Sequence, residues 1–117
     1  MVYISAQDFC EKARKYHRLS RQEELNCARE MKNGDLQARR RLIQSYLPFV
    51  AGYIGRLPEH IQGVGLVTYC LQALERAVDS FNFFQEGESF IHRLSWCLRQ
   101  ASTGYIARRG CEDSDTQ

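Results

Sequence analysis

Apolar residues recur at every third or fourth position along almost the whole chain, and this period constrains the fold more than any other feature. It is clearest over residues 42–57 and 66–81, where each helical turn places one or two apolar side chains on the same face. No run of alternating apolar and polar residues competes with it, so strands are not expected. We therefore predict an all-α fold, a small helical bundle.

Local signals place the ends of five predicted helices. Ser20 and Glu23 form a capping box, in which each side chain bonds the backbone amide of the other residue. Asn33-Gly34 is typical of a helix that ends in a left-handed turn. Pro48 removes one amide donor from the long third segment, so we expect a kink near its middle. The predicted helices span residues 5–16, 20–33, 35–57, 66–81 and 88–109, with a turn or short helix over 59–65 and a polar loop over 82–87.

The length of 117 residues suits one domain with a modest core. We expect a single helical domain over residues 1–110 and a disordered acidic tail over residues 111–117. The first residues lack the basic and apolar regions of a secretory signal, and no uncharged apolar stretch approaches the roughly 20 residues that span a bilayer. We therefore expect a cytoplasmic protein without membrane contact.

The residue types that usually carry catalysis or bind metals are scattered along the chain. The five cysteines never occur as Cys-x-x-Cys, so structural thiols are favoured over zinc ligands. His17, His60 and His92 show no spacing to a carboxylate or a nucleophile that would build a catalytic site. We predict a protein that is not an enzyme and that needs neither a cofactor nor a metal.

The last predicted helix has a face that a plain core helix does not need. Residues 93, 96, 100 and 103 lie on one side of it, away from the apolar stripe. Guanidinium groups there can neutralise phosphates, amide and hydroxyl groups can bond base edges, and an indole ring can stack on an unpaired base. The alternative is that the tryptophan packs against the Phe83-Phe84 loop while its polar neighbours are solvated. The residues of this face are Arg93, Trp96, Gln100 and Thr103, flanked by His92 and Arg99.

Four motifs follow one another between about residues 19 and 109. A lead-in over residues 19–25 precedes Gly34-Asp35, which opens a Gly-Asp-x-x-Ala-Arg-x-x-Leu-Ile pattern over residues 34–43. Residues 73–81 end in Ala-Val-x-x-Phe, and residues 90–101 combine a Phe and a Trp with Leu-Arg-Gln-Ala. In order and spacing these motifs resemble region 2 of bacterial sigma factors of the sigma-70 family.

The resemblance implies a helical bundle that acts in transcription initiation. It implies that the helix over residues 66–81 binds RNA polymerase core, and that the helix over residues 89–105 reads and opens the minus-ten element of promoter DNA. By position, Gln100 and Thr103 face the upstream duplex edge and Trp96 stacks at the melting junction. The implied polymerase contacts are Val67, Cys70, Leu71, Leu74 and Glu75, and the implied DNA contacts are Phe90, His92, Arg93, Trp96, Arg99, Gln100 and Thr103.

The sequence also departs from the family pattern. Arg93 and Cys97 stand where housekeeping sigma factors carry aromatic rings, and residues 65–70 contain no acid where the family has an acidic motif. Either a separate subunit supplies the family's second DNA-binding domain, or the chain is not a working initiation factor. Two alternatives stay open: a degenerate sigma-like interaction module that uses an apolar Leu66–Leu74 surface instead of reading promoters, and a general helical nucleic-acid binder with salt-dependent, sequence-blind affinity.

Overall fold

The computed structural model describes residues 3–115 of the chain, with side chains described for residues 3–109. Within this range every regular element is a helix, which confirms the predicted all-α bundle. No helix in the described part is long and apolar enough to cross a membrane. The elements are α1 (Ala6–Ala13), α2 (Arg21–Lys32), α3 (Leu36–Ser45), α4 (Leu47–Gly55), the short 3₁₀ helix η1 (Glu59–Ile61), α5 (Val64–Ser80) and α6 (Phe90–Asp115).

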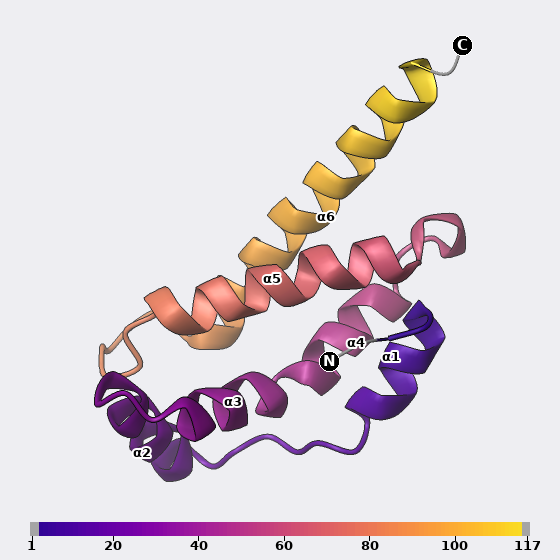
Figure 1. The fold of residues 1–117 in the computed structure, drawn as a ribbon. Coiled ribbons are helices and arrows are strands. Elements are labelled where there is room, and N and C mark those ends of the chain that lie inside the picture. Colours follow the sequence, from indigo (N-terminus) through magenta and orange to yellow (C-terminus); the bar gives the residue numbers. More distant parts are fainter. Residues whose placement is uncertain (1–2, 116–117) are drawn as a thin grey trace.

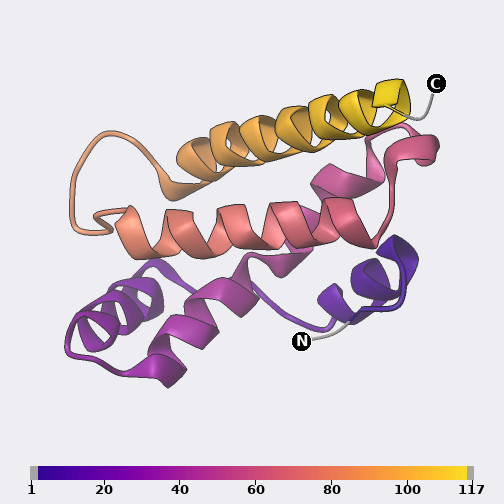
Figure 2. The same ribbon diagram turned by 45° about the horizontal axis from the view of Figure 1, so that its top comes forward.

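The helices pack as neighbouring pairs along an elongated body of 52 × 27 × 24 Å. Helix α2 packs against α3, and α1 packs against α4 (Figure 1). Helices α5 and α6 run side by side in opposite directions, as Figure 2 shows, and make the most extensive helix pair. Because α5 also contacts α1, α3 and α4, it lies between α6 and the rest of the bundle.

The helix starts obey the predicted capping chemistry. Ser5 Oγ accepts a hydrogen bond from the Asp8 amide at 3.0 Å, and Ser20 and Glu23 form the full capping box. Asp35 accepts bonds from two amides of the first turn of α3. Gly34, directly before it, has a φ of 94°, so the left-handed turn that ends α2 is confirmed.

The long third helix predicted over residues 35–57 is two helices. The chain breaks at Tyr46, where φ is −103° and ψ is 0°, and α4 starts anew with Pro48 in its first turn. Pro48 has no amide to donate to the carbonyl group of Gln44, and the first turn of a helix is the place where a missing donor costs least. The proline therefore separates α3 from α4 instead of kinking one helix.

Two predicted helix ends also differ from the structure. Helix α1 stops at Ala13 and not near Tyr16. Helix α6 does not stop near Arg109 but runs to Asp115, since one glycine at position 110 lowers helix propensity by about 1 kcal/mol without breaking the hydrogen-bond ladder. The segment 111–117, predicted as a disordered tail, thus overlaps α6 as far as residue 115, and residues 116–117 lie outside the described range.

Four aromatic rings fill the core at the turn between α5 and α6. Tyr46, Phe81, Phe83 and Phe90 form a chain of contacts with ring centroids 4.6–5.3 Å apart. Phe83 belongs to the loop that we predicted to be polar, yet only 2% of it is exposed. Its burial anchors the loop and fixes where α6 begins.

A buried carboxyl group joins three parts of the bundle beside these rings. Glu24 of α2 is 6% exposed, and its carboxyl group accepts a hydrogen bond from the Tyr46 hydroxyl. Arg21 donates to Glu24 at 3.3 Å and to the backbone carbonyl of Phe83 at 2.9 Å. We call Arg21, Glu24, Tyr46 and the Phe83 carbonyl the polar joint. It ties α2 to the α3–α4 junction and to the α5–α6 loop.

We expect Tyr46→Phe to destabilise the fold by about 1–3 kcal/mol, because it leaves a buried carboxyl group without one of its two donors. Urea unfolding followed by circular dichroism measures the change. Tyr69→Phe is the matched control, since the Tyr69 hydroxyl accepts from Arg108 at the surface and its loss should cost much less. Equal stability of the Tyr46→Phe variant and wild type would contradict the role of the polar joint.

The buried thiol of Cys70 predicts a pH dependence of stability. Burial raises the pKa of the Cys70 thiol from 9.0 to about 12. The unfolded chain therefore loses this proton at a lower pH than the folded protein, and stability that is present below pH 9 is lost as the pH rises toward 12. The free energy of unfolding falls by at most about 1.4 kcal/mol per pH unit because of this one thiol.

Urea unfolding between about pH 8 and 10.5 tests this expectation against Cys70→Ala. The variant is less stable at every pH because of the cavity, so the slope of stability against pH is the quantity to compare. Wild type should lose stability more steeply above pH 9 than the variant. Parallel slopes would show that the Cys70 thiol does not contribute.

Candidate nucleic-acid interface

Helix α6 presents one polar and aromatic face to solvent. Trp96 is 56% exposed, and Arg93, Gln100 and Thr103 are exposed on the same side of the helix. The rings of the Phe83-Phe84 loop are engaged elsewhere: Phe83 lies in the core, and Phe84 lies 5.1 Å from the Lys32 ammonium group. The sequence alternative of a tryptophan buried against this loop is therefore wrong.

The charge of this face is positive along most of its length. From Phe90 to Arg109, α6 carries four arginines and no acidic residue. Arg93 forms an ion pair with Glu88 at 3.4 Å, in which both side chains are more than 30% exposed. Such a solvated pair is worth only about 0–1 kcal/mol, so a phosphate can replace the carboxylate at low cost. The helix can therefore attract polyanions.

Trp96 stands between two hollows of the surface. One has a volume of about 260 Å³ and is lined by Glu88, His92, Arg93 and Trp96. The other, of about 340 Å³, lies between α5 and α6 and also reaches Trp96 and Gln100. An exposed indole beside open hollows offers ring surface for stacking, which is worth about 1–3 kcal/mol per base.

One of the predicted DNA contacts, Phe90, is buried in this structure. Phe90 is 4% exposed and belongs to the core ring cluster with Tyr46, Phe81 and Phe83. It sits on the inward side of the first turn of α6, so its ring is not available to line a groove. The other six predicted residues, His92, Arg93, Trp96, Arg99, Gln100 and Thr103, are all exposed on α6.

Three of the five predicted polymerase contacts are also buried in this structure. Val67, Cys70 and Leu74 are at most 1% exposed, because α5 packs on several helices and uses this stripe as its core face. Leu71 is half-buried and Glu75 is exposed. The apolar Leu66–Leu74 surface expected for an interaction module is thus part of the core.

The exposed face of α5 is polar instead. It includes the predicted contact Glu75 together with Thr68 and Gln72, which were not predicted although they lie opposite the apolar stripe. Asp79 continues this face and is held by Arg39 through two bonds of 2.7 and 3.0 Å. The helical period of the apolar residues in α5 could have predicted these positions, because residues opposite an apolar stripe face solvent.

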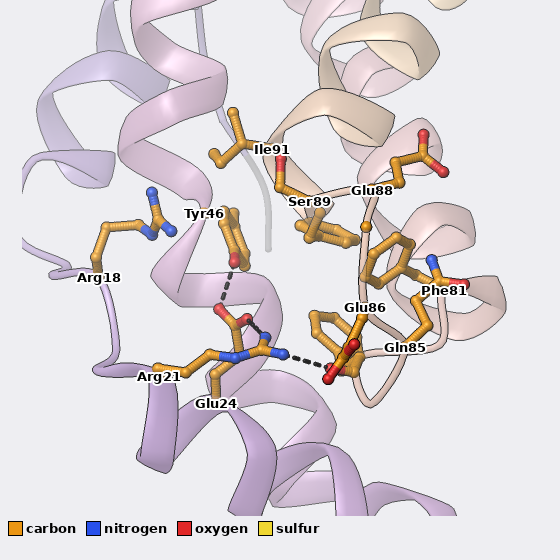
Figure 3. A pocket seen from close by; sticks show the side chains of 13 residues that line it. Arg18, Arg21, Glu24, Tyr46, Phe81, Gln85, Glu86, Glu88, Ser89 and Ile91 are labelled. Atoms are coloured by element: carbon orange, nitrogen blue, oxygen red, sulfur yellow. Dashed lines mark hydrogen bonds and ion pairs between the residues drawn. The ribbon is translucent and has the colours of Figure 1, made fainter.

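A hollow of about 480 Å³ surrounds the polar joint (Figure 3). Arg18 also lines this hollow, and its guanidinium group lies over the Tyr46 ring, 4.7 Å from the ring centroid. Glu86 and Glu88 of the α5–α6 loop line the opposite wall. The buried polar groups here bond one another, so the hollow is structural. Sequence reasoning missed it: the capping box identifies Glu23, but no local pattern indicates that Glu24 is buried.

The described residues offer no group of three or more His, Cys, Asp or Glu side chains that could hold a metal ion. Cys10, Cys27, Cys70 and Cys97 are free thiols. Burial raises the pKa of the Cys10, Cys27 and Cys70 thiols, which disfavours the reactive thiolate.

The chain is similar to a known transcription protein. It is 34% identical over 93 residues to the RNA polymerase sigma factor SigA of Clostridium acetobutylicum, which supports a relationship to a sigma factor. The match covers 76% of this chain and 24% of that protein, so the chain spans about a quarter of the length of this relative. No protein-family model matches the chain, and no solved structure matches it.

The exposed Trp96 on a basic helix predicts charge-selective quenching of its fluorescence. The chain has one tryptophan, so the emission reports on this site alone. At low ionic strength, iodide should quench Trp96 more strongly than caesium does, because Arg93 and Arg99 concentrate anions near the ring. Added salt should reduce the difference. Caesium quenching as strong as iodide quenching at low salt would contradict a positive surface.

Proposed function

We propose that this chain is a sigma-70-like region 2 protein that acts in bacterial transcription initiation in the cytoplasm. In this proposal it binds RNA polymerase core and contacts the minus-ten element of the promoter through α6. The observation that carries the proposal is the exposure of Trp96 beside Arg93 and Gln100, the residues at which the family resemblance implies DNA contact. The similarity to a sigma factor over most of the chain supports the same function.

Each exposed residue of α6 has a role that its chemistry permits. Trp96 stacks on a base at the edge of the opened duplex. Gln100 and Thr103, one and two turns farther along α6, donate and accept hydrogen bonds at base edges. Arg93 and Arg99 neutralise phosphates on either side of the ring, and His92 lies beside Arg93 along the displaced strand. Phe90 supports the helix from the core.

The polymerase-binding surface in this proposal is the exposed face of α5. It consists of Thr68, Gln72 and Glu75, with Leu71 at its half-buried edge. The chain itself catalyses no reaction and needs no cofactor, because the polymerase makes the bonds. The binding energy is used to place α6 on the promoter.

Trp96→Ala tests the DNA contact. Single-stranded DNA selected from a random library by the complex of this protein with polymerase core should bind the variant about 5- to 150-fold more weakly, as expected for the loss of one stacked base. Phe84→Ala, which removes another exposed ring, is the control and should bind normally. Unchanged binding of the Trp96→Ala complex would refute promoter reading by α6.

Polymerase binding is tested by retention of purified core enzyme on the immobilised chain. Glu75→Arg changes an exposed side chain, so it should fold normally and lose retention, whereas Leu71→Glu alters a half-buried position and needs a circular dichroism check. Glu30→Arg on the exposed surface of α2, which changes the net charge by the same amount, is the charge-matched control. Retention of core by none of the proteins, wild type included, would refute the sigma-like role and favour the interaction-module alternative.

A further inference from the structure

A groove follows the seam between α5 and the part of α6 from Trp96 to Arg109. Its first part is the hollow of about 340 Å³ beside Trp96, and its second part is a hollow of about 320 Å³ near Arg108 and Arg109. Tyr69 of α5 lines both hollows, so they join into one surface, which we call the α5–α6 groove. Its lining residues are Tyr69, Ala73 and Arg76 of α5 and Trp96, Cys97, Gln100, Ala101, Gly104, Tyr105, Arg108 and Arg109 of α6.

The middle of the groove is apolar and partly fixed in shape. Ala73, Ala101 and Gly104 leave space between the helices, and Tyr69 packs edge-on against Tyr105 with centroids 5.3 Å apart. The Tyr105 ring lies directly on Gly65 of α5, where an added Cβ would come within 2.8 Å of it. The absence of a side chain at position 65 therefore lets Tyr105 approach α5 and form one wall of the groove.

The charges of the groove lie at its two ends. Arg76 is at the end near Trp96, and Arg108 and Arg109 are at the other end. Arg108 donates to the Tyr69 hydroxyl at 3.2 Å, and Arg109 lies 5.7 Å from the Tyr105 ring. Among residues 3–109, whose side chains are described, no acidic residue lines the groove and no carboxylate pairs with Arg76. The groove thus combines an apolar centre with positive ends.

This pattern fits an acidic peptide better than a nucleic-acid strand. The interval from Trp96 to Arg109 corresponds to about 20 Å of helix, or about four turns. A nucleic-acid strand carries a phosphate on every nucleotide and would need cations along the whole interval, whereas the centre holds small apolar residues. An amphipathic segment with apolar anchors on one face and acids at both ends matches both the centre and the ends.

We propose that the α5–α6 groove binds an acidic amphipathic segment of another protein. The segment places its apolar side chains between Tyr69 and Ala101 and pairs its terminal carboxylates with Arg76 and Arg109. Trp96 and Gln100 border the groove and also belong to the DNA face, so a bound segment would compete with DNA. This competition rests on the proposed function, but binding in the groove does not.

The test uses the full chain and the fluorescence of Trp96. The probe is a synthetic peptide of about 14 residues, four helical turns long, with leucines at every third and fourth position and two glutamates at each end. We expect a saturable shift of the emission. Arg76→Glu and Arg109→Glu should each weaken binding about tenfold through charge repulsion, and Arg56→Glu, on the exposed end of α4, should not. A peptide with lysines at its ends should bind at least about tenfold more weakly than the acidic one.

Three results would overturn the proposal: no binding of the acidic peptide, equal binding of the lysine peptide, or binding that ignores Arg76 and Arg109. Stronger Arg76-dependent binding of a mixed-sequence single-stranded DNA than of the peptide would assign the groove to nucleic acid and overturn it as well. The outcome is independent of the promoter assay. Peptide binding without promoter binding would refute only the proposed function, and promoter binding without peptide binding would refute only the groove.

Discussion

The arrangement of this bundle depends on the hydrogen bonds that the buried carboxyl group of Glu24 accepts. A buried carboxyl group is costly unless it is hydrogen-bonded, and here Tyr46 and Arg21 both donate to it. Burial and the bond to Glu24 raise the pKa of Tyr46, so its hydroxyl remains a donor. Since Arg21 also donates to the Phe83 carbonyl, two neighbouring residues of α2 together fix the break between α3 and α4 and the loop that leads into α6.

The position of α6 follows from this joint and from the rings beside it. Phe81, Phe83 and Phe90 pack around Tyr46, so the loop turns inward before α6 starts. Phe90 then points into the core, and the helical period directs Arg93 and Trp96 to solvent. The exposed face of α6 is therefore a consequence of how its first turn is anchored. Phe90, which was predicted to contact DNA, instead anchors the first turn of α6 and so fixes the direction of Arg93 and Trp96.

Helix α5 contributes to the two surfaces for which we propose partners. The apolar stripe of α5 is buried against the other helices. The surface of α5 that remains consists of a polar outer face and the seam with α6. Tyr69 stands on the seam, where it contacts Tyr105 and Arg108. The surface that could meet a polymerase and the groove that could hold an acidic segment thus lie on different sides of one helix, while Trp96 borders both the groove and the DNA face.

The sequence by itself determined the helices, their caps and the outward face of α6. Those features depend on neighbours three or four residues apart, as at Ser20 and Glu23 or along Arg93, Trp96 and Gln100, so the local pattern contains the necessary information. Tertiary structure alone decided which helix faces were left free. Cys70 and Leu74 were predicted to form a binding surface, but they pack in the core. Phe83 belongs to a loop predicted to be polar, yet its side chain is buried. Glu24 is buried, whereas Glu23, its neighbour in the capping box, is exposed. Each of these outcomes depends on partners more than 20 positions away or on another helix, and the energy of burial is set by those partners and not by the residue itself.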